Sequence, residues 1–147
     1  MATPADRTLE LMAQLVGFDT TSHLSNLNLI SFIEEYLARH GVTARRIESD
    51  DGEKSNLLAT IGPEIAGGVV LSGHTDVVPV TGQDWLSDPF TLDTRTVDGD
   101  ERHFGRGTAD MKGFIASVLA RVPEMVAANL KTPIHIALSY DEEVGCL

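Results

Sequence analysis

The sequence predicts an α/β fold, in which a mixed, mainly parallel sheet is flanked by helices. Two observations predict it. Apolar residues recur at helical spacing in three segments, and short apolar or alternating runs typical of strands lie between and after these segments. The chain of 147 residues has the length of one domain, and no repeat or low-complexity linker divides residues 1–147 into two.

Two helices are expected in the first third of the chain. The first should begin at Thr3 and Pro4, where a capping hydroxyl, a proline in the first turn and the early acid Asp6 mark a helix start. The second should cover about residues 26–40 and stop at Gly41. Its expected inner face consists of Leu29, Ile30, Ile33 and Leu37.

The pattern then changes from helical to extended. Residues 42–48 and 56–62 are expected to be strands, joined by the acidic turn 49–55. A short apolar run at 67–74 begins with two glycines, which is typical of a strand buried on both faces.

A loop at residues 79–90 and a hairpin at 91–105 come next, and Asp98-Gly99 is the dipeptide expected at the hairpin turn. A long helix follows from Met111. Pro123 should kink or end that helix, because proline lacks a backbone donor and clashes with the preceding turn.

One more strand, residues 133–140, is expected to complete the fold. The apolar stripe that predicts the long helix is formed by Met111, Phe114, Ile115, Val118, Leu119 and Val122.

Composition narrows the classes of partner. The formal net charge of −11 argues against nucleic acid, whose phosphates require basic patches. No apolar stretch approaches the ~20 residues that span a bilayer, so no membrane helix is expected. The N-terminus lacks the basic and apolar regions of a secretory signal, and a single cysteine, Cys146, excludes an internal disulfide. These features predict a cytoplasmic protein, and the net charge does not otherwise identify a partner.

Polar residues gather where the expected strands end. Ligand sites in open α/β sheets lie beyond the carboxyl ends of strands, so these residues are the candidates for a functional site. They are His74 and Asp76 after the third strand, Asp110 before the long helix, and Asp141, Glu142 and Glu143 after the last strand.

The residue types suit a metal site. His74 and Asp76 are two apart and so face the same side of an extended segment, where a carboxylate can hold an imidazole in one tautomer. Glu142 and Glu143 are adjacent, so one could bind a metal while the other faces water or substrate. An imidazole with several carboxylates suits zinc, with cobalt or manganese as substitutes.

Each residue also has a purely structural interpretation. His74 could be a satisfied polar residue at a strand end, and Asp110 could be a helix N-cap. The acidic run could be a solvated loop. The separations of 36 residues (74 to 110) and 33 residues (110 to 143) match no short local metal motif, so spacing alone leaves both interpretations open.

Four segments resemble the successive motifs of one known family. "SGHTDVVPV", "DWLSDPF", "GRGTADMKGFIA" and "YDEEVG" are similar to motifs of the M20 family of co-catalytic zinc amidohydrolases and peptidases. The resemblance covers the chain from the first helix to Leu147. It implies a zinc-peptidase-like catalytic domain and zinc-dependent hydrolysis of an amide, with a small N-acyl amino acid as substrate.

The resemblance assigns roles to five residues. It implies that His74 binds one zinc, that Asp110 bridges two zinc ions, and that Glu143 binds the second. Glu142 matches the general base and Asp76 the residue that orients His74. It further implies a cis peptide between Asp110 and its neighbour Met111.

The chain also departs from the family pattern. M20 enzymes are more than twice this length, and their lid domain, further acidic ligand and late histidine ligand have no counterpart here. We therefore expect 1–147 to be the N-terminal portion of a catalytic domain, truncated, with weak metal occupancy and an exposed sheet edge. Any homo-oligomer would belong to the longer form, since the lid supplies the family's dimer interface.

Two other classes of function remain. A non-catalytic metal-binding or interaction fragment would fold but show no turnover at any zinc concentration. A structural domain with coincidental acids would keep its metal affinity when Asp110 and Glu143 are replaced by alanine.

Overall fold

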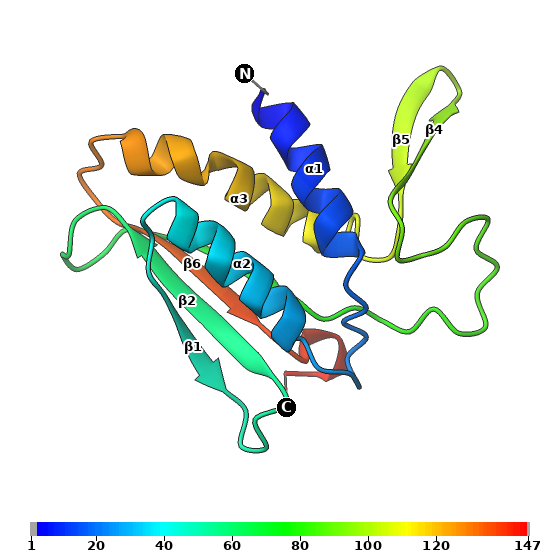
Figure 1. The fold of residues 1–147 in the computed structure, drawn as a ribbon, viewed down its shortest axis with the longest axis horizontal. Coiled ribbons are helices and arrows are strands. Elements are labelled where there is room, and N and C mark those ends of the chain that lie inside the picture. Colours follow the sequence, from blue (N-terminus) through cyan, green and yellow to red (C-terminus); the bar gives the residue numbers. More distant parts are fainter. Residues whose placement is uncertain (1–2, 147) are drawn as a thin grey trace.

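The computed structural model describes residues 3–146. Within these residues the chain forms two separate sheets and three α-helices (Figure 1). The main sheet has four strands in the order β1-β2-β6-β3, and β4 and β5 form a hairpin of their own. The elements are α1 (Pro4–Val16), α2 (Leu27–Arg39), β1 (Ala44–Glu48), β2 (Ser55–Ile61), β3 (Val69–His74), β4 (Asp93–Val97), β5 (Asp100–Phe104), α3 (Lys112–Ala127), β6 (Ile134–Ser139) and the short 3-10 helix η1 (Glu142–Val144).

The first two helices are confirmed. Thr3 caps α1 through a reciprocal capping box, in which the Asp6 carboxylate accepts from the Thr3 amide and the Thr3 hydroxyl accepts from the Asp6 amide. Helix α2 lies within one residue of its expected ends, and its four expected inner residues are all fully buried. Gly41 follows it at φ +75°, the left-handed conformation that glycine adopts without steric cost.

Helix α3 begins as expected but does not end at Pro123. It continues to Ala127, so Pro123 does not end it, and the other expected outcome, a kink at Pro123, stays a prediction. Val122 is fully buried and Met125 packs against the core, and this packing holds the last turn in place despite the missing proline donor. None of the helices within residues 3–146 is long and apolar enough to cross a membrane.

The sheet is mixed, as predicted, but it is not mainly parallel. β1 pairs with β2 and β2 pairs with β6 in antiparallel fashion, and only β3 with β6 is parallel among the described strands. The short acidic turn accounts for the antiparallel pairing of β1 with β2, because a connection of a few residues can join only antiparallel neighbours.

Burial alternates along the central strands. In β2, Leu57, Ala59 and Ile61 are buried while the intervening residues are more exposed. Helices α2 and α3 pack on the sheet, and α1 packs on α3 (Figure 1). The core therefore lies between one face of the sheet and the helices.

The expectation that β3 is buried on both faces is wrong. β3 lies at an edge of the sheet, and Val69 and Val70 are 57% and 58% exposed. The exposed sheet edge expected for this chain is found at this strand, whose two valines add exposed apolar surface to it.

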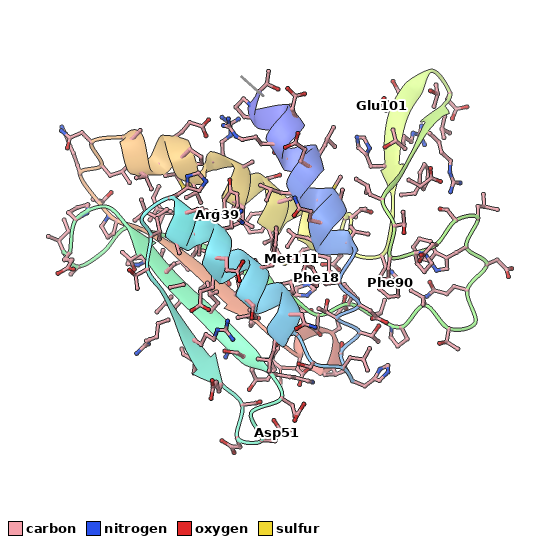
Figure 2. The ribbon with its side chains drawn as sticks, in the orientation of Figure 1. Phe18, Arg39, Asp51, Phe90, Glu101 and Met111 are labelled. Carbon is pink, nitrogen blue, oxygen red and sulfur yellow. The ribbon has the colours of Figure 1, made fainter. Side chains whose placement is uncertain are left out.

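The hairpin of β4 and β5 stands apart from the main sheet (Figure 1). Asp98 and Gly99 form its turn, both at positive φ, which confirms the predicted hairpin. Figure 2 places Glu101 on this hairpin and Asp51 at the tip of the turn between β1 and β2.

Candidate metal centre

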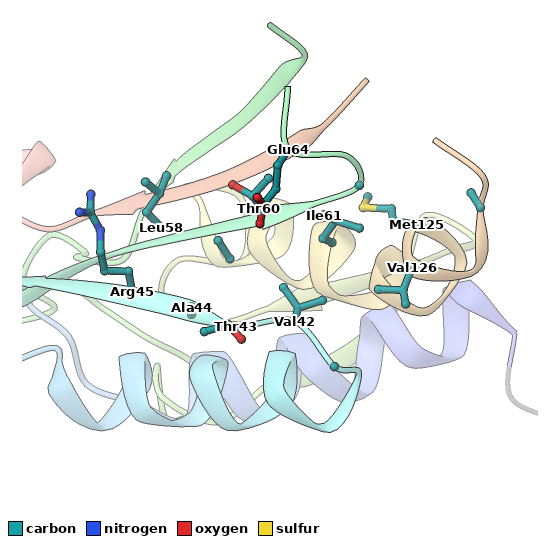
Figure 3. Close-up of a pocket in the computed structure, with 14 residues that line it drawn as sticks. Val42, Thr43, Ala44, Arg45, Leu58, Thr60, Ile61, Glu64, Met125 and Val126 are labelled. Carbon is teal, nitrogen blue, oxygen red and sulfur yellow. The ribbon is translucent and has the colours of Figure 1, made fainter. Parts of the chain in front are cut away.

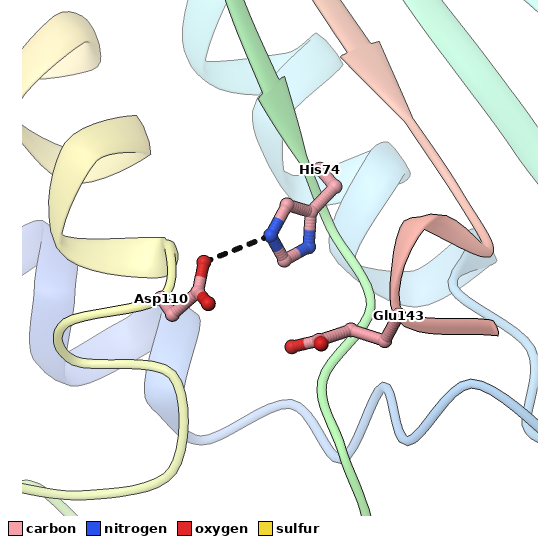
Figure 4. A group of neighbouring side chains, drawn as sticks. All are labelled: His74, Asp110 and Glu143. Carbon is pink, nitrogen blue, oxygen red and sulfur yellow. Dashed lines mark hydrogen bonds and ion pairs between the residues drawn. The ribbon is translucent and has the colours of Figure 1, made fainter. Parts of the chain in front are cut away.

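Three candidate ligands meet at one edge of the sheet. β3 and β6 are parallel neighbours, so their carboxyl ends lie together: His74 ends β3, and η1 with Glu143 follows β6. Asp110 reaches the same place from the segment that leads into α3. Figure 4 shows the three side chains facing a common space, and each offers a ligand atom within 4.8 Å of the others.

Distances define the cluster further. His74 Nε2 lies 3.0 Å from Asp110 Oδ1 and 3.7 Å from Glu142 Oε2. The side chain of His74 is only 6% exposed, whereas that of Asp110 is 75% exposed and that of Glu142 49%. The cluster thus has a buried imidazole at its base and carboxylates open to solvent.

The structure rejects one alternative role for Asp110. Helix α3 has Met111 as its N-cap, with no side-chain capping bond, and the Asp110 carboxylate faces His74 instead. The peptide between Asp110 and Met111 is cis, as the family resemblance implies.

His74 is held in a defined orientation. Its Nδ1 lies 3.0 Å from the backbone carbonyl of Asp76, and since a carbonyl can only accept, Nδ1 carries the proton. In the neutral imidazole this leaves the Nε2 lone pair directed at the cluster, which is the tautomer a metal ligand requires.

The carboxylate of Asp76 mainly serves the acidic turn. It is 3.4 Å from His74 Nδ1, but it accepts hydrogen bonds from the backbone amides of Glu142 and Glu143, each at 3.1 Å. Ser22 Oγ donates a third bond at 2.7 Å. Asp76 is 3% exposed, so a buried carboxylate joins the histidine segment to the turn that carries both glutamates.

A buried polar loop after α1 supports this arrangement. Thr21 forms a parallel bridge with Val77, and Thr20 Oγ1 donates to the carbonyl of Thr75 at 2.6 Å. Lys54 donates to the carbonyl of Ser22 and to Asp141. The sequence analysis did not predict these roles for Ser22 and Lys54. For Lys54 a signal was available, because it is the one cationic residue in the acidic turn 49–55.

Electrostatics of the cluster favour a cation. Burial would lower the pKa of His74, but the hydrogen bond to Asp110, the carbonyl of Asp76 and the charges of Asp76 and Glu142 raise it above its ordinary value. Burial and the negative charge of Asp110 raise the pKa of Glu143. Without a metal, the 3.0 Å contact between His74 Nε2 and Asp110 Oδ1 needs a second proton shared by these two atoms; a metal ion bound between them would replace that proton and leave the neutral imidazole described above.

The donor set fits zinc. If a single ion were bound, one imidazole and two carboxylates would give it three ligands, the number that a catalytic zinc site takes from the protein. A cavity of about 310 Å³ adjoins the cluster and is lined by Val78, residues 105–110 and Glu143. A second cavity, of about 550 Å³, lies between the start of β1, the end of β2 and the end of α3 (Figure 3). None of the candidate ligands lines it.

The sequence places this fold and cluster in a known family. Peptidase family M20/M25/M40 matches residues 70–147, the part that contains all five candidate site residues. The chain belongs to this family, whose members include metal-dependent hydrolases.

Two similar curated proteins are acetylornithine deacetylases. The chain is 36% identical over 146 residues to the acetylornithine deacetylase of Pasteurella multocida (strain Pm70), covering 95% of this chain and 37% of that protein. It is 38% identical over 145 residues to the acetylornithine deacetylase of Yersinia pseudotuberculosis serotype O:1b (strain IP 31758), covering 93% of this chain and 36% of that one. The chain thus spans a little over a third of the length of these relatives.

Solved structures support the fold. Human carnosine dipeptidase 1 superposes with a TM-score of 0.78 at 24% identity, over 97% of this chain and 33% of that one. The M20 family metallo-carboxypeptidase Sso-CP2 from Sulfolobus solfataricus gives 0.77 at 23% identity, over 95% of this chain and 32% of that one. The α/β architecture with its mixed sheet is therefore that of M20 catalytic domains.

Proposed function

We propose that this chain is the N-terminal portion of the catalytic domain of a zinc-dependent amidohydrolase that removes the acetyl group from N2-acetylornithine. The observation that carries the proposal is the convergence of His74, Asp110 and Glu143 within 4.8 Å, with Glu142 beside them. The names of the curated relatives support the choice of substrate.

The metal-binding roles are those that the family resemblance implies, and the convergence of the three side chains supports them. His74 and Asp110 would hold one ion, and Asp110 and Glu143 a second, with cobalt as a possible substitute. Zinc bound there would polarise the amide carbonyl and lower the pKa of water. Since the chain contributes only two ligands to each ion in this assignment, we expect weak binding, and the activity assay requires metal in excess.

Glu142 is the residue we assign to proton transfer. Its side chain is half exposed and borders the cluster, and its backbone amide is fixed by Asp76. Glu142 would take a proton from the attacking water and return it to the departing amine. The bond broken is the amide C–N bond, and the products are acetate and ornithine, in a step towards arginine.

The test measures amine release by the 147-residue chain with added zinc or cobalt. N2-acetylornithine is compared with N-succinyl-diaminopimelate, the substrate of the related desuccinylase. We expect faster release from the acetyl substrate and a loss of at least about 100-fold in Glu142→Gln, as removal of a general base implies.

Faster release from the succinyl substrate would contradict the substrate assignment. A folded chain that binds zinc and releases no amine at any metal concentration would contradict catalysis by this chain and favour a non-catalytic metal-binding fragment.

A further inference from the structure

We propose that Lys54 is a positioning residue for the acidic turn that carries Glu142 and Glu143. The proposal rests on the proposed function for the roles of the two glutamates, but the contacts of Lys54 stand independently of it. Lys54 immediately precedes β2 and reaches two segments distant in sequence, the loop after α1 and the turn after β6.

The ammonium group of Lys54 makes two hydrogen bonds. Its Nζ donates to Asp141 Oδ1 at 2.5 Å and to the backbone carbonyl of Ser22 at 2.6 Å. The side chains of Lys54 and Asp141 are only 19% and 16% exposed. This limited exposure and the second acceptor distinguish the pair from a solvent-exposed ion pair, which contributes little.

Asp141 connects Lys54 to the turn that carries the two glutamates. It is the N-cap of η1 and adopts the left-handed conformation, with φ +59°. Its carbonyl accepts from the amide of Cys146 at 2.8 Å, and its own peptide bond leads directly into Glu142. Because non-glycine residues adopt this conformation infrequently, the ion pair with Lys54 helps to hold Asp141 in it.

Ser22 provides a second route to the same turn. Lys54 holds the Ser22 carbonyl, while Ser22 Oγ donates to the Asp76 carboxylate that accepts from the amides of Glu142 and Glu143. Lys54 is thus connected to the turn twice, directly through Asp141 and indirectly through Ser22 and Asp76. Lys54 also places a positive charge directly beside the carboxylate of Asp141, which immediately precedes the two glutamates.

The test is amide hydrogen exchange, resolved by residue with NMR, on the chain without added metal. In Lys54→Met, the amides of Glu142 and Glu143 should exchange at least about tenfold faster, equivalent to about 1.4 kcal/mol. The amide of the fully buried Leu119 in α3 should change by less than about twofold, because local opening of the turn does not require unfolding of the core.

Two variants serve as controls. Lys54→Arg keeps the charge and should restore most of the protection. Lys131→Met removes an exposed lysine and should leave both glutamate amides unchanged. Equal acceleration at Leu119 and at the turn would show a merely structural role for Lys54 and overturn the proposal, as would unchanged exchange at Glu142 and Glu143.

Cobalt absorption links the positioning to the site. If the proposed function also holds, Lys54→Met should bind Co²⁺ at least about tenfold more weakly than the wild type. A faster-exchanging turn with unchanged Co²⁺ affinity would support positioning by Lys54 while contradicting the assigned role of Glu143. Failure of the Lys54 proposal is therefore read from hydrogen exchange, and failure of the proposed function from Co²⁺ affinity.

Discussion

Replacing Asp76 by asparagine should destabilise the chain through the acidic turn. The carboxylate is 3% exposed and accepts three hydrogen bonds, from Ser22 Oγ and from the amides of Glu142 and Glu143. An asparagine side chain keeps one acceptor oxygen, and its NH₂ group then faces a backbone N–H or the serine hydroxyl.

The magnitude follows from these contacts. A hydrogen bond to a charged group contributes roughly 1.5–3 kcal/mol, and a buried donor without an acceptor costs about 1–3 kcal/mol. Relief from burying a charge offsets part of the loss. We expect the free energy of unfolding of Asp76→Asn to fall by about 2–4 kcal/mol.

Urea denaturation of the chain without metal measures this loss. With a slope of about 2 kcal/mol per molar urea, the midpoint should fall by about 1–2 M at an unchanged slope. The control is Asp98→Asn, whose side chain is 84% exposed, and it should change the unfolding free energy by less than about 0.5 kcal/mol. An Asp76→Asn variant as stable as the control would refute the assigned role of the buried carboxylate.

Three further predictions concern stability, pH and association. Ser22→Ala should lower the unfolding free energy by about 1–2 kcal/mol in the same urea assay, because it removes one donor to a buried carboxylate; no change would exclude that bond. The raised pKa of His74 implies stability that is fully present below pH 6.5, its ordinary pKa, and lost as pH rises through the folded value. In the metal-free chain, part of the urea midpoint should therefore come from His74, and this part should decrease as pH rises above 6.5. His74→Gln should remove that decrease, and an identical pH profile in the variant would contradict the raised pKa of His74. Val70→Lys at the exposed edge strand should reduce self-association in sedimentation velocity, and equal association in both chains would show that β3 is not the contact.

Local patterns predicted the elements better than their arrangement. The capping box at Thr3, the stop at Gly41 and the turn at Asp98 and Gly99 each depend on neighbouring residues, and the structure confirms all three. Strand direction depends on which strands pair, and pairing is a tertiary property that local patterns do not determine. The prediction of a mainly parallel sheet is therefore wrong, although its strands are found. The apolar run in β3 was likewise assigned to a buried strand, although it lies at an edge.

The candidate site divides in the same way. The structure brings His74, Asp110 and Glu143 together, and their side-chain chemistry was visible in the sequence. The support around them was not visible, because it acts through backbone groups: Asp76 holds two amides of the turn, and Lys54 holds the carbonyl of Ser22. Main-chain donors and acceptors are the same at every non-proline residue and therefore leave no motif.

Metal binding by the three converging side chains is the central claim, and isothermal titration of the chain with zinc tests it most directly. His74→Ala, Asp110→Ala and Glu143→Ala are compared with Glu101→Ala, a hairpin glutamate whose side chain is 67% exposed (Figure 2). Loss of a ligand should weaken binding at least as much as loss of a residue that orients one, about 10–100-fold. We predict saturable zinc binding that survives in Glu101→Ala and is weakened to this extent in each of the other three variants. Equal zinc affinity in all four variants would contradict the claim.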